Sequence, residues 1–203
     1  MNRRICLAAM ASIATRAPAA DPPTEVAGVR YPPTLGLAGA TLVLNGAGIR
    51  YRTVIKVYTA GLYLGARASS PEAVLAAPGP KRMSVTMLRE IDSNELGKLL
   101  TRGMQDNSPR DEFSKAIPGT FRLGEIFAAR KRLGPGDQFS IDYVPGLGTT
   151  VLINGKPAGE PIAEPEFFRC LLRIWLGPSP ADHLLKDALL GQQRQPSGQG
   201  LTQ

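Results

Sequence analysis

The stretch NGAGIRYRTVIKVYTAGLYL, residues 45–64, decides the fold of this chain. It opens on Asn45-Gly46, a dipeptide that favours a tight turn. From Arg50 to Leu64 it is rich in β-branched and aromatic residues, which predicts one long strand. Alternate strand residues point to opposite faces, so Ile55, Val57, Thr59, Gly61 and Tyr63 share one face and Lys56, Tyr58, Ala60, Leu62 and Leu64 share the other. Both faces are largely apolar, so we expect a central strand covered on both sides.

The segments around this strand separate into runs of strands and runs of helices. Residues 81–89, 138–143 and 149–153 read as strands, the first two with alternating apolar and polar side chains. Residues 93–104 and 164–176 carry apolar residues three or four positions apart, which predicts amphipathic helices. This segregation indicates an α+β domain in which helices pack on an antiparallel sheet.

Charge and composition narrow the classes of function. The chain of 203 residues has a formal net charge of +7, and three of its cations lie in the first twenty residues. The remaining Lys and Arg residues are scattered without a basic run, which argues against a nucleic-acid partner. No segment approaches the ~20 consecutive apolar residues that a membrane span needs. The length fits one domain.

The two ends of the chain differ from its middle. Arg3 and Arg4, the apolar residues 5–14 and the small residues 17–20 have the order of a signal peptide. We therefore predict a signal peptide over residues 1–20 and a periplasmic location in a bacterium, with a disordered cytosolic tail as the alternative. Residues 192–203 consist largely of Gln, Gly, Pro and Ser, which predicts a disordered tail. The folded domain is expected over residues 21–191.

The sequence offers few residues for metal or nucleophilic chemistry. Removal of the signal peptide leaves Cys170 as the one cysteine, among the apolar residues of the second helix, where a small core residue is expected. His183 is the one histidine and follows a predicted helix start. No second His or Cys could share a metal ion with either residue, so we expect no metal and no cofactor.

Several motifs together resemble one known family. Gly46-Ala47-Gly48-Ile49-Arg50 followed by residues 56–64 resembles the start of the chalcone isomerases and of their fatty-acid-binding relatives, in which a Gly-Ala-Gly-x-Arg turn precedes a Lys-x-x-Thr-Ala-x-Gly-x-Tyr-Leu strand. The bacterial members are more similar still. The motifs shared with them lie at residues 29–34, 71–75, 143–149, 154–157 and 171–177. The resemblance runs from about Glu25 to Gly191.

This resemblance implies an open-faced β-sandwich, in which an antiparallel sheet carries a layer of helices on one face and a ligand cleft lies between them. In the plant enzymes of the family, a phenolate oxygen adds to an enone and the enolate that forms is stabilised. An Arg, a Thr, a Tyr and a Lys serve that reaction, because negative charge moves onto the ketone oxygen in the transition state.

The resemblance places the candidate site residue by residue. The arginine of the Gly-x-Arg motif falls on Arg50, with Arg52 as the alternative, and the strand threonine falls on Thr59. The helix that supplies the plant Tyr and Lys corresponds to residues 93–103, where Leu96 and Leu99 stand instead of the polar pair. A late position in the cleft wall falls close to Phe168. Arg50 and Thr59 are thus the candidate catalytic residues, and all six are candidate ligand contacts.

Three functions follow from this site. A cleft with a cation at one end and Leu and Phe in place of polar groups suits an apolar or amphiphilic ligand such as a fatty acid, whose carboxylate Arg50 would bind. The alternative is a chalcone isomerase type of intramolecular lyase with a reduced site, in which Arg50 and Thr59 supply electrostatic stabilisation of a flavonoid-like substrate. A third hypothesis is that the protein is a scaffold that assists an envelope complex without binding any ligand.

Overall fold

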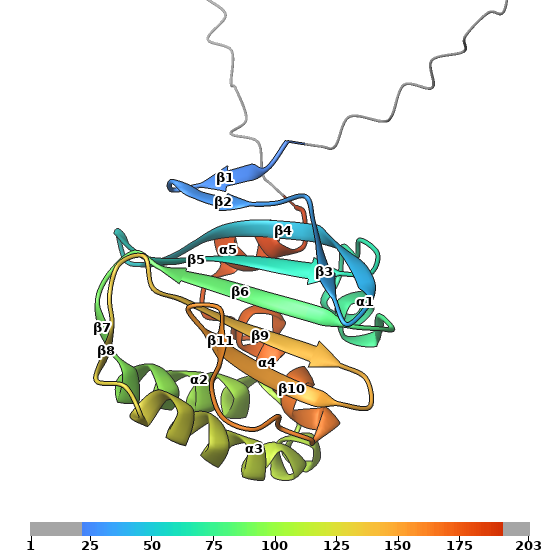
Figure 1. Cartoon of the computed structure of the whole chain (residues 1–203), viewed down its shortest axis with the longest axis vertical. Helices are drawn as coiled ribbons and strands as arrows, with labels where there is room; N and C mark the ends of the chain where they lie inside the picture. Colours follow the sequence, from blue (N-terminus) through green and yellow to red (C-terminus); the bar gives the residue numbers. More distant parts are fainter. Residues whose placement is uncertain (1–21, 193–203) are drawn as a thin grey trace, which may run out of the picture.

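The computed structural model describes residues 22–192, so the predicted signal peptide and all but the first residue of the predicted tail lie outside the described residues. The chain forms a curled sheet with helices against it (Figure 1). The strands are β1 (Thr24–Val26), β2 (Val29–Tyr31), β3 (Thr34–Leu37), β4 (Ala40–Arg52), β5 (Ile55–Leu64), β6 (Lys81–Met87), β7 (Ile91–Asp92), β8 (Arg132–Leu133), β9 (Gln138–Val144), β10 (Gly148–Ile153) and β11 (Lys156–Pro157). The helices are α1 (Pro71–Ala76), α2 (Ser93–Asn107), α3 (Arg110–Ala128), α4 (Pro165–Leu176) and α5 (His183–Leu189).

The main sheet has seven strands in the order β11-β10-β9-β6-β5-β4-β3, and every neighbouring pair is antiparallel. Two small pairs, β1 with β2 and β7 with β8, stand outside it. The predicted α+β class with an antiparallel sheet is therefore confirmed. No helix among residues 22–192 combines the length and the apolar character that crossing a membrane requires.

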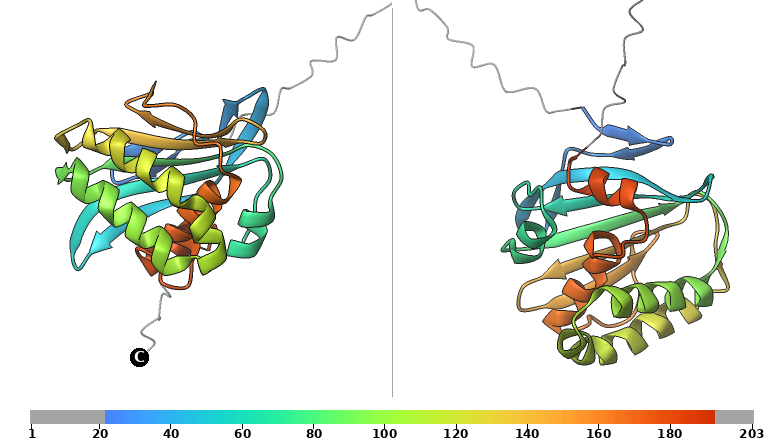
Figure 2. Two further views of the ribbon diagram at one scale, coloured as in Figure 1. Left: turned by 90° about the horizontal axis from the view of Figure 1, so that it is seen from below. Right: turned by 180° about the vertical axis from the view of Figure 1, so that it is seen from behind.

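The helices gather on one face of the sheet, as the views from below and from behind show (Figure 2). The core between the two layers holds the buried aromatic residues of α3, α4 and β9, among them Phe127, Phe139, Phe167 and Trp175. The other face of β4 and β5 is covered by the β1–β2 hairpin, whose Tyr31 packs with Leu42, Leu44, Ala47 and Tyr63. The expectation of a strand covered on both faces is thus confirmed for residues 58–64, whereas Ile55 and Lys56 are exposed.

The sequence prediction was wrong about where the strands turn. One strand was expected from Arg50 to Leu64, whereas β4 ends at Arg52 and β5 begins at Ile55. The two-residue connection contains Thr53 with a φ of 58°, a left-handed conformation that β-branched residues rarely adopt. Because neither Thr53 nor Val54 is a typical turn residue, the sequence carries no local signal for this hairpin.

The turn expected at Asn45-Gly46 is also absent, because β4 continues through both residues with a bulge in its pairing to β5. The side chain of Asn45 explains the bulge. Its amide nitrogen donates to the carbonyl oxygens of Ala68 (2.9 Å) and Leu189 (2.7 Å), and its amide oxygen accepts from the Ala68 N–H (2.7 Å). These tertiary hydrogen bonds take the place of the local ones that an Asn-Gly turn would make.

The amphipathic helices lie where the sequence predicted them. Asp92 caps α2 by accepting a hydrogen bond from the Glu95 N–H (3.1 Å). Pro165 occupies the first turn of α4, whose apolar side is buried across its whole length. Cys170 on α4 is buried in the core, and His183 is exposed at the first position of α5.

Helix α5 contacts β4 through glycine. A Cβ at Gly46 would overlap the carbonyl oxygen of Ala188, and a Cβ at Gly48 would lie 2.6 Å from the Ala188 Cβ. We expect Gly46→Ala to lower the free energy of unfolding by about 3 kcal/mol, because the atom in the way is rigid backbone. Urea unfolding of the purified protein measures this change.

Gly36 in β3 is the matched control, since a Cβ there meets nothing within 4 Å. Gly36→Ala should change the free energy of unfolding by less than about 0.5 kcal/mol. Equal stabilities for the two variants would show that α5 does not press on β4.

Candidate functional site

A small pocket opens where the sheet meets the helices. It has a volume of about 190 Å³ and takes its walls from β4, β5, α2, α4 and the loop between α4 and α5. Its lining consists of Arg50, Tyr58, Leu96, Leu99, Leu100, Arg102, Gly103, Asp106, Asn107, Ile174, Ser179 and Ala181. We call it the Arg50 pocket.

Arg50 carries the positive charge of this pocket. It is paired in register with Tyr58 on β5, and its guanidinium carbon lies 5.4 Å from the centre of the Tyr58 ring, within the range of a cation–π interaction. Its Nε is buried and has no hydrogen-bond partner. None of the ion pairs among residues 22–192 includes Arg50. The pocket therefore contains a cation whose buried N–H lacks an acceptor.

Tyr58 adds a neutral hydroxyl beside this cation. The indole N–H of Trp175 donates to the Tyr58 oxygen (2.8 Å), and an indole nitrogen can only donate. The proton of the Tyr58 hydroxyl is therefore left for another acceptor. Burial raises the pKa of Tyr58 to about 12, although the charge of Arg50 and the hydrogen bond from Trp175 act in the opposite direction. At neutral pH Tyr58 is thus a protonated hydrogen-bond donor.

The pocket also has an apolar wall, and Asn107 holds its two sides together. The apolar atoms come from Leu96, Leu99 and Leu100 of α2 and from Ile174 of α4. The Asn107 side chain donates to the carbonyl oxygens of Gly103 and Ser179 (both 2.9 Å) and accepts from the Ser179 N–H (2.8 Å). These bonds tie the end of α2 to the loop after α4, which fixes the distance between the two walls.

Two carboxylates lie near the pocket, and both have partners. Asp106 on the rim forms an ion pair with Arg102 (3.5 Å). Asp182 accepts from the backbone N–H groups of Tyr51 (2.7 Å), Leu184 (2.7 Å) and Leu185 (3.1 Å) as the cap of α5. The pocket thus presents a guanidinium, a hydroxyl donor and an apolar wall, which together suit an oxygen anion attached to an apolar body.

The structure brings together three of the six residues that the sequence suggested. Arg50, Leu96 and Leu99 line one pocket. Arg52 does not, because it is exposed at the end of β4. Phe168 does not either, because it lies on α4 over Tyr143, with 5.0 Å between the ring centres, in a separate pocket.

Thr59 points away from the Arg50 pocket, so the expectation that it faces the same cleft as Arg50 was wrong. It is fully buried on the opposite face of β5, where its hydroxyl accepts a hydrogen bond from Tyr31 (2.7 Å). A step of one residue along a strand reverses the face, and Tyr58 takes its place in the pocket. In the family pattern the threonine stands three residues before the glycine of the strand. In this chain the residue three positions before Gly61 is Tyr58, so aligning the two glycines would have identified Tyr58.

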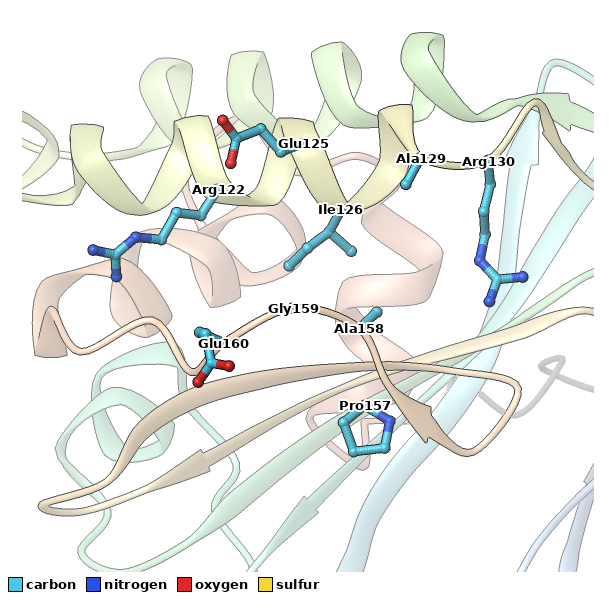
Figure 3. Close-up of a pocket in the computed structure, with 9 residues that line it drawn as sticks. All are labelled: Arg122, Glu125, Ile126, Ala129, Arg130, Pro157, Ala158, Gly159 and Glu160. Atoms are coloured by element: carbon cyan, nitrogen blue, oxygen red, sulfur yellow. The ribbon is translucent and has the colours of Figure 1, made fainter.

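A larger hollow lies elsewhere, between α3 and residues 157–160, with a volume of about 770 Å³. Figure 3 shows Ile126 between the helix and this segment, with Arg122 and Arg130 toward the two ends of the hollow. None of its lining residues has a buried polar atom without a partner. Its two arginines are exposed, so we place the candidate site at Arg50, where a buried guanidinium nitrogen lacks an acceptor. Among residues 22–192, no cluster of three His, Cys, Asp or Glu side chains could hold a metal ion.

Comparisons with known proteins agree with the fold. A family model described as chalcone isomerase-like matches residues 23–191. The crystal structure of a fatty-acid binding protein from Arabidopsis thaliana superposes with a TM-score of 0.63, at 15% sequence identity, over 80% of this chain and 92% of that chain. The comparison with curated proteins found no match.

The buried tyrosines predict how stability depends on alkaline pH. Tyr31 and Tyr58 both have their pKa raised from 10.0 to about 12, chiefly by burial. Their stabilising contribution is therefore complete below pH 10.0 and is lost as the pH rises toward about 12, since the unfolded chain loses these protons first. Urea unfolding at about pH 9 and about pH 11 measures how steeply the free energy of unfolding falls with pH.

The Tyr58→Phe variant separates the contribution of this residue. The free energy of unfolding of this variant should fall less steeply over the same pH range, because one of the buried phenols with a raised pKa has been removed. An unchanged slope would show that Tyr58 ionises equally easily in the folded and unfolded states.

Proposed function

The chain belongs to the chalcone isomerase-like family, and we propose that it binds a small amphiphilic carboxylic acid, such as a fatty acid, in the Arg50 pocket. The carboxylate accepts hydrogen bonds from Arg50 and Tyr58, and the alkyl part lies against Leu96, Leu99 and Ile174. The observation that carries this proposal is the buried Nε of Arg50, which has no partner.

Electrostatics favours an anion over a neutral ligand at this position. Arg50 is half-buried, and its Nε is buried without an acceptor, so a carboxylate bound there would offset the cost of removing that N–H group from water. Hydrogen bonds to a charged group contribute about 1.5–3 kcal/mol each. The two donors of the pocket thus select for a carboxylate head.

The size of the pocket limits how much of the ligand it encloses. Its 190 Å³ is below the ~300–1,000 Å³ of clefts that enclose a drug-sized ligand. It holds a carboxylate and the first few carbons of a chain, and the half-exposed Leu99 extends the apolar wall outward. Each methylene buried there contributes about 0.8 kcal/mol.

The solved structure of similar fold supports this reading, because that protein is described as a fatty-acid binding protein. At 15% identity the likeness concerns the fold. The ligand class for this chain is argued from Arg50, Tyr58 and the leucines of α2.

Calorimetric titration with dodecanoate tests the proposal. We expect Arg50→Gln to weaken binding at least tenfold, because a charge-assisted hydrogen bond of about 1.5–3 kcal/mol is lost and about 1.4 kcal/mol corresponds to tenfold. Dodecanol, which has the same chain without the charge, should bind the wild-type protein more weakly than dodecanoate.

Arg52→Gln is the matched control, since it removes the same charge two residues further along β4, outside the pocket. Its affinity for dodecanoate should equal that of the wild type. If the two variants lose affinity equally, the effect is one of net charge, and the carboxylate does not bind at Arg50.

The pairing of Arg50 with Tyr58 makes an intramolecular lyase the second candidate. An enolate oxygen would find the same N–H and O–H donors, which is the arrangement that stabilises such an anion. Loss of 2′-hydroxychalcone absorbance on ring closure measures the activity. A rate above that of buffer, lowered in Tyr58→Phe, would favour catalysis over binding, and a rate equal to buffer would exclude it.

Two further expectations from the sequence remain proposals. We propose that residues 1–20 direct export to the periplasm, on the strength of Arg3, Arg4 and the apolar residues that follow. N-terminal sequencing of the protein from its host would detect removal of this segment. If the protein instead acts as a scaffold in an envelope complex, native mass spectrometry of the protein purified from its host should find no co-purifying ligand.

A further inference from the structure

A second unpaired cation lies at the opposite end of the sheet. Lys81 begins β6, where it pairs with Tyr143 of β9, and only 5% of its surface is exposed. It borders a pocket of about 170 Å³ whose walls include Leu75, Tyr143, Phe168, Arg169 and Leu172. We call this the Lys81 pocket. It shares no lining residue with the Arg50 pocket.

The amine of Lys81 has no polar partner in the part of the chain that the structure describes. No side-chain hydrogen bond and no ion pair there involves its Nζ. The nitrogen lies 5.4 Å from the centre of the Tyr143 ring, and that ring stacks on Phe168. Within residues 22–192, the one contact recorded for the amine is therefore with the face of an aromatic ring.

The charges around Lys81 disfavour its protonated form. Arg169 borders the same pocket, and the acids that neutralise Arg169 are Glu112 (2.6 Å) and Glu166 (3.8 Å). Glu112 is also paired with Arg173, so the nearby carboxylates are engaged with arginines. Burial, and then the charge of Arg169, lower the pKa of the Lys81 amine.

We propose that Lys81 is a nucleophilic amine that condenses with small aliphatic aldehydes in the Lys81 pocket. Burial in an apolar pocket and a neighbouring cation are the two conditions that activate a lysine as a nucleophile. Both meet at Lys81, and nothing in the fold requires a lysine to be buried at this position without a counter-charge.

The reaction balances without a further reactant. The lone pair of Nζ attacks the carbonyl carbon while the C=O π electrons move to oxygen, and transfer of a proton from nitrogen to oxygen gives a carbinolamine. The nitrogen lone pair then forms the C=N bond as the C–O bond breaks, and the remaining N–H proton passes to the departing oxygen, so one amine and one aldehyde give one imine and one water.

The size of the pocket defines the class of aldehyde. At about 30 Å³ for each water molecule of liquid volume, its 170 Å³ has room for a molecule of only a few heavy atoms. Leu75, Leu172 and the Tyr143–Phe168 stack provide apolar contact for a short alkyl group. Propanal, with four heavy atoms, is therefore the probe.

The test is reductive alkylation of the full chain with propanal and cyanoborohydride at about pH 7 and about pH 9, followed by peptide mapping. Cyanoborohydride reduces the imine to a stable propylamine on the modified lysine. We expect Lys81 to be labelled faster than Lys98 at about pH 7, because the lowered pKa of Lys81 leaves a larger fraction of its amine neutral than the raised pKa of Lys98 does. The ratio of the two labelling rates should be smaller at about pH 9, because a larger fraction of the Lys98 amine is neutral there.

Lys98 is the internal reference, since it is exposed and its hydrogen bond to Glu95 raises its pKa. Lys81→Arg should abolish the fast label while keeping the charge, and Lys98→Arg should leave it unchanged. Labelling of exposed lysines with Lys81 unmodified, or equal rates for Lys81 and Lys98, would overturn the proposal. Neither result bears on dodecanoate binding, which is measured separately at Arg50.

Discussion

The backbone contact between α5 and β4 is the constraint on which the rest of the structure depends. At Gly46 and Gly48 the strand lies so close to Ala188 that neither position has room for a side chain. Asn45 holds the end of the helix through the Leu189 carbonyl (2.7 Å), and Asp182 holds its start through the Tyr51 N–H (2.7 Å). These contacts hold α5 along β4, on the face of the strand from which Arg50 meets its cross-strand partner Tyr58.

The same sheet carries an unpaired cation at each of two distant positions, and the two surroundings favour different chemistry. Arg50 lies beside a hydroxyl donor and leucine side chains, so its guanidinium suits a carboxylate. Lys81 can lose its proton, and its surroundings of aromatic carbon and the Arg169 charge promote that loss. The two proposed sites therefore differ through the acidity of the cationic side chain and the polarity of its neighbours.

Much of the fold could be predicted because it follows from local periodicity. The apolar spacing in residues 93–104 and 164–176 predicted α2 and α4, and the separation of strands from helices predicted the antiparallel sheet. The hairpin at Thr53-Val54 could not be predicted, since neither residue favours a turn. At Asn45-Gly46 a turn was predicted where the strand in fact continues. The Asn45 side chain, which would otherwise form the turn, makes tertiary hydrogen bonds to Ala68 and Leu189 instead.

The sequence by itself determined the α+β class, the family resemblance, and the presence of Arg50, Leu96 and Leu99 in one region, because these depend on patterns and motifs along the chain. The motif spacing favours Tyr58 over Thr59 as the residue beside Arg50, but only the tertiary structure decided which face of β5 the helices cover. Thr59 and Tyr58 are adjacent, so a strand must turn one to the helices and the other to the β1–β2 hairpin. That choice was made by α5 packing on Gly46 and Gly48 and by Tyr31 binding Thr59 (2.7 Å), contacts between residues far apart in the sequence.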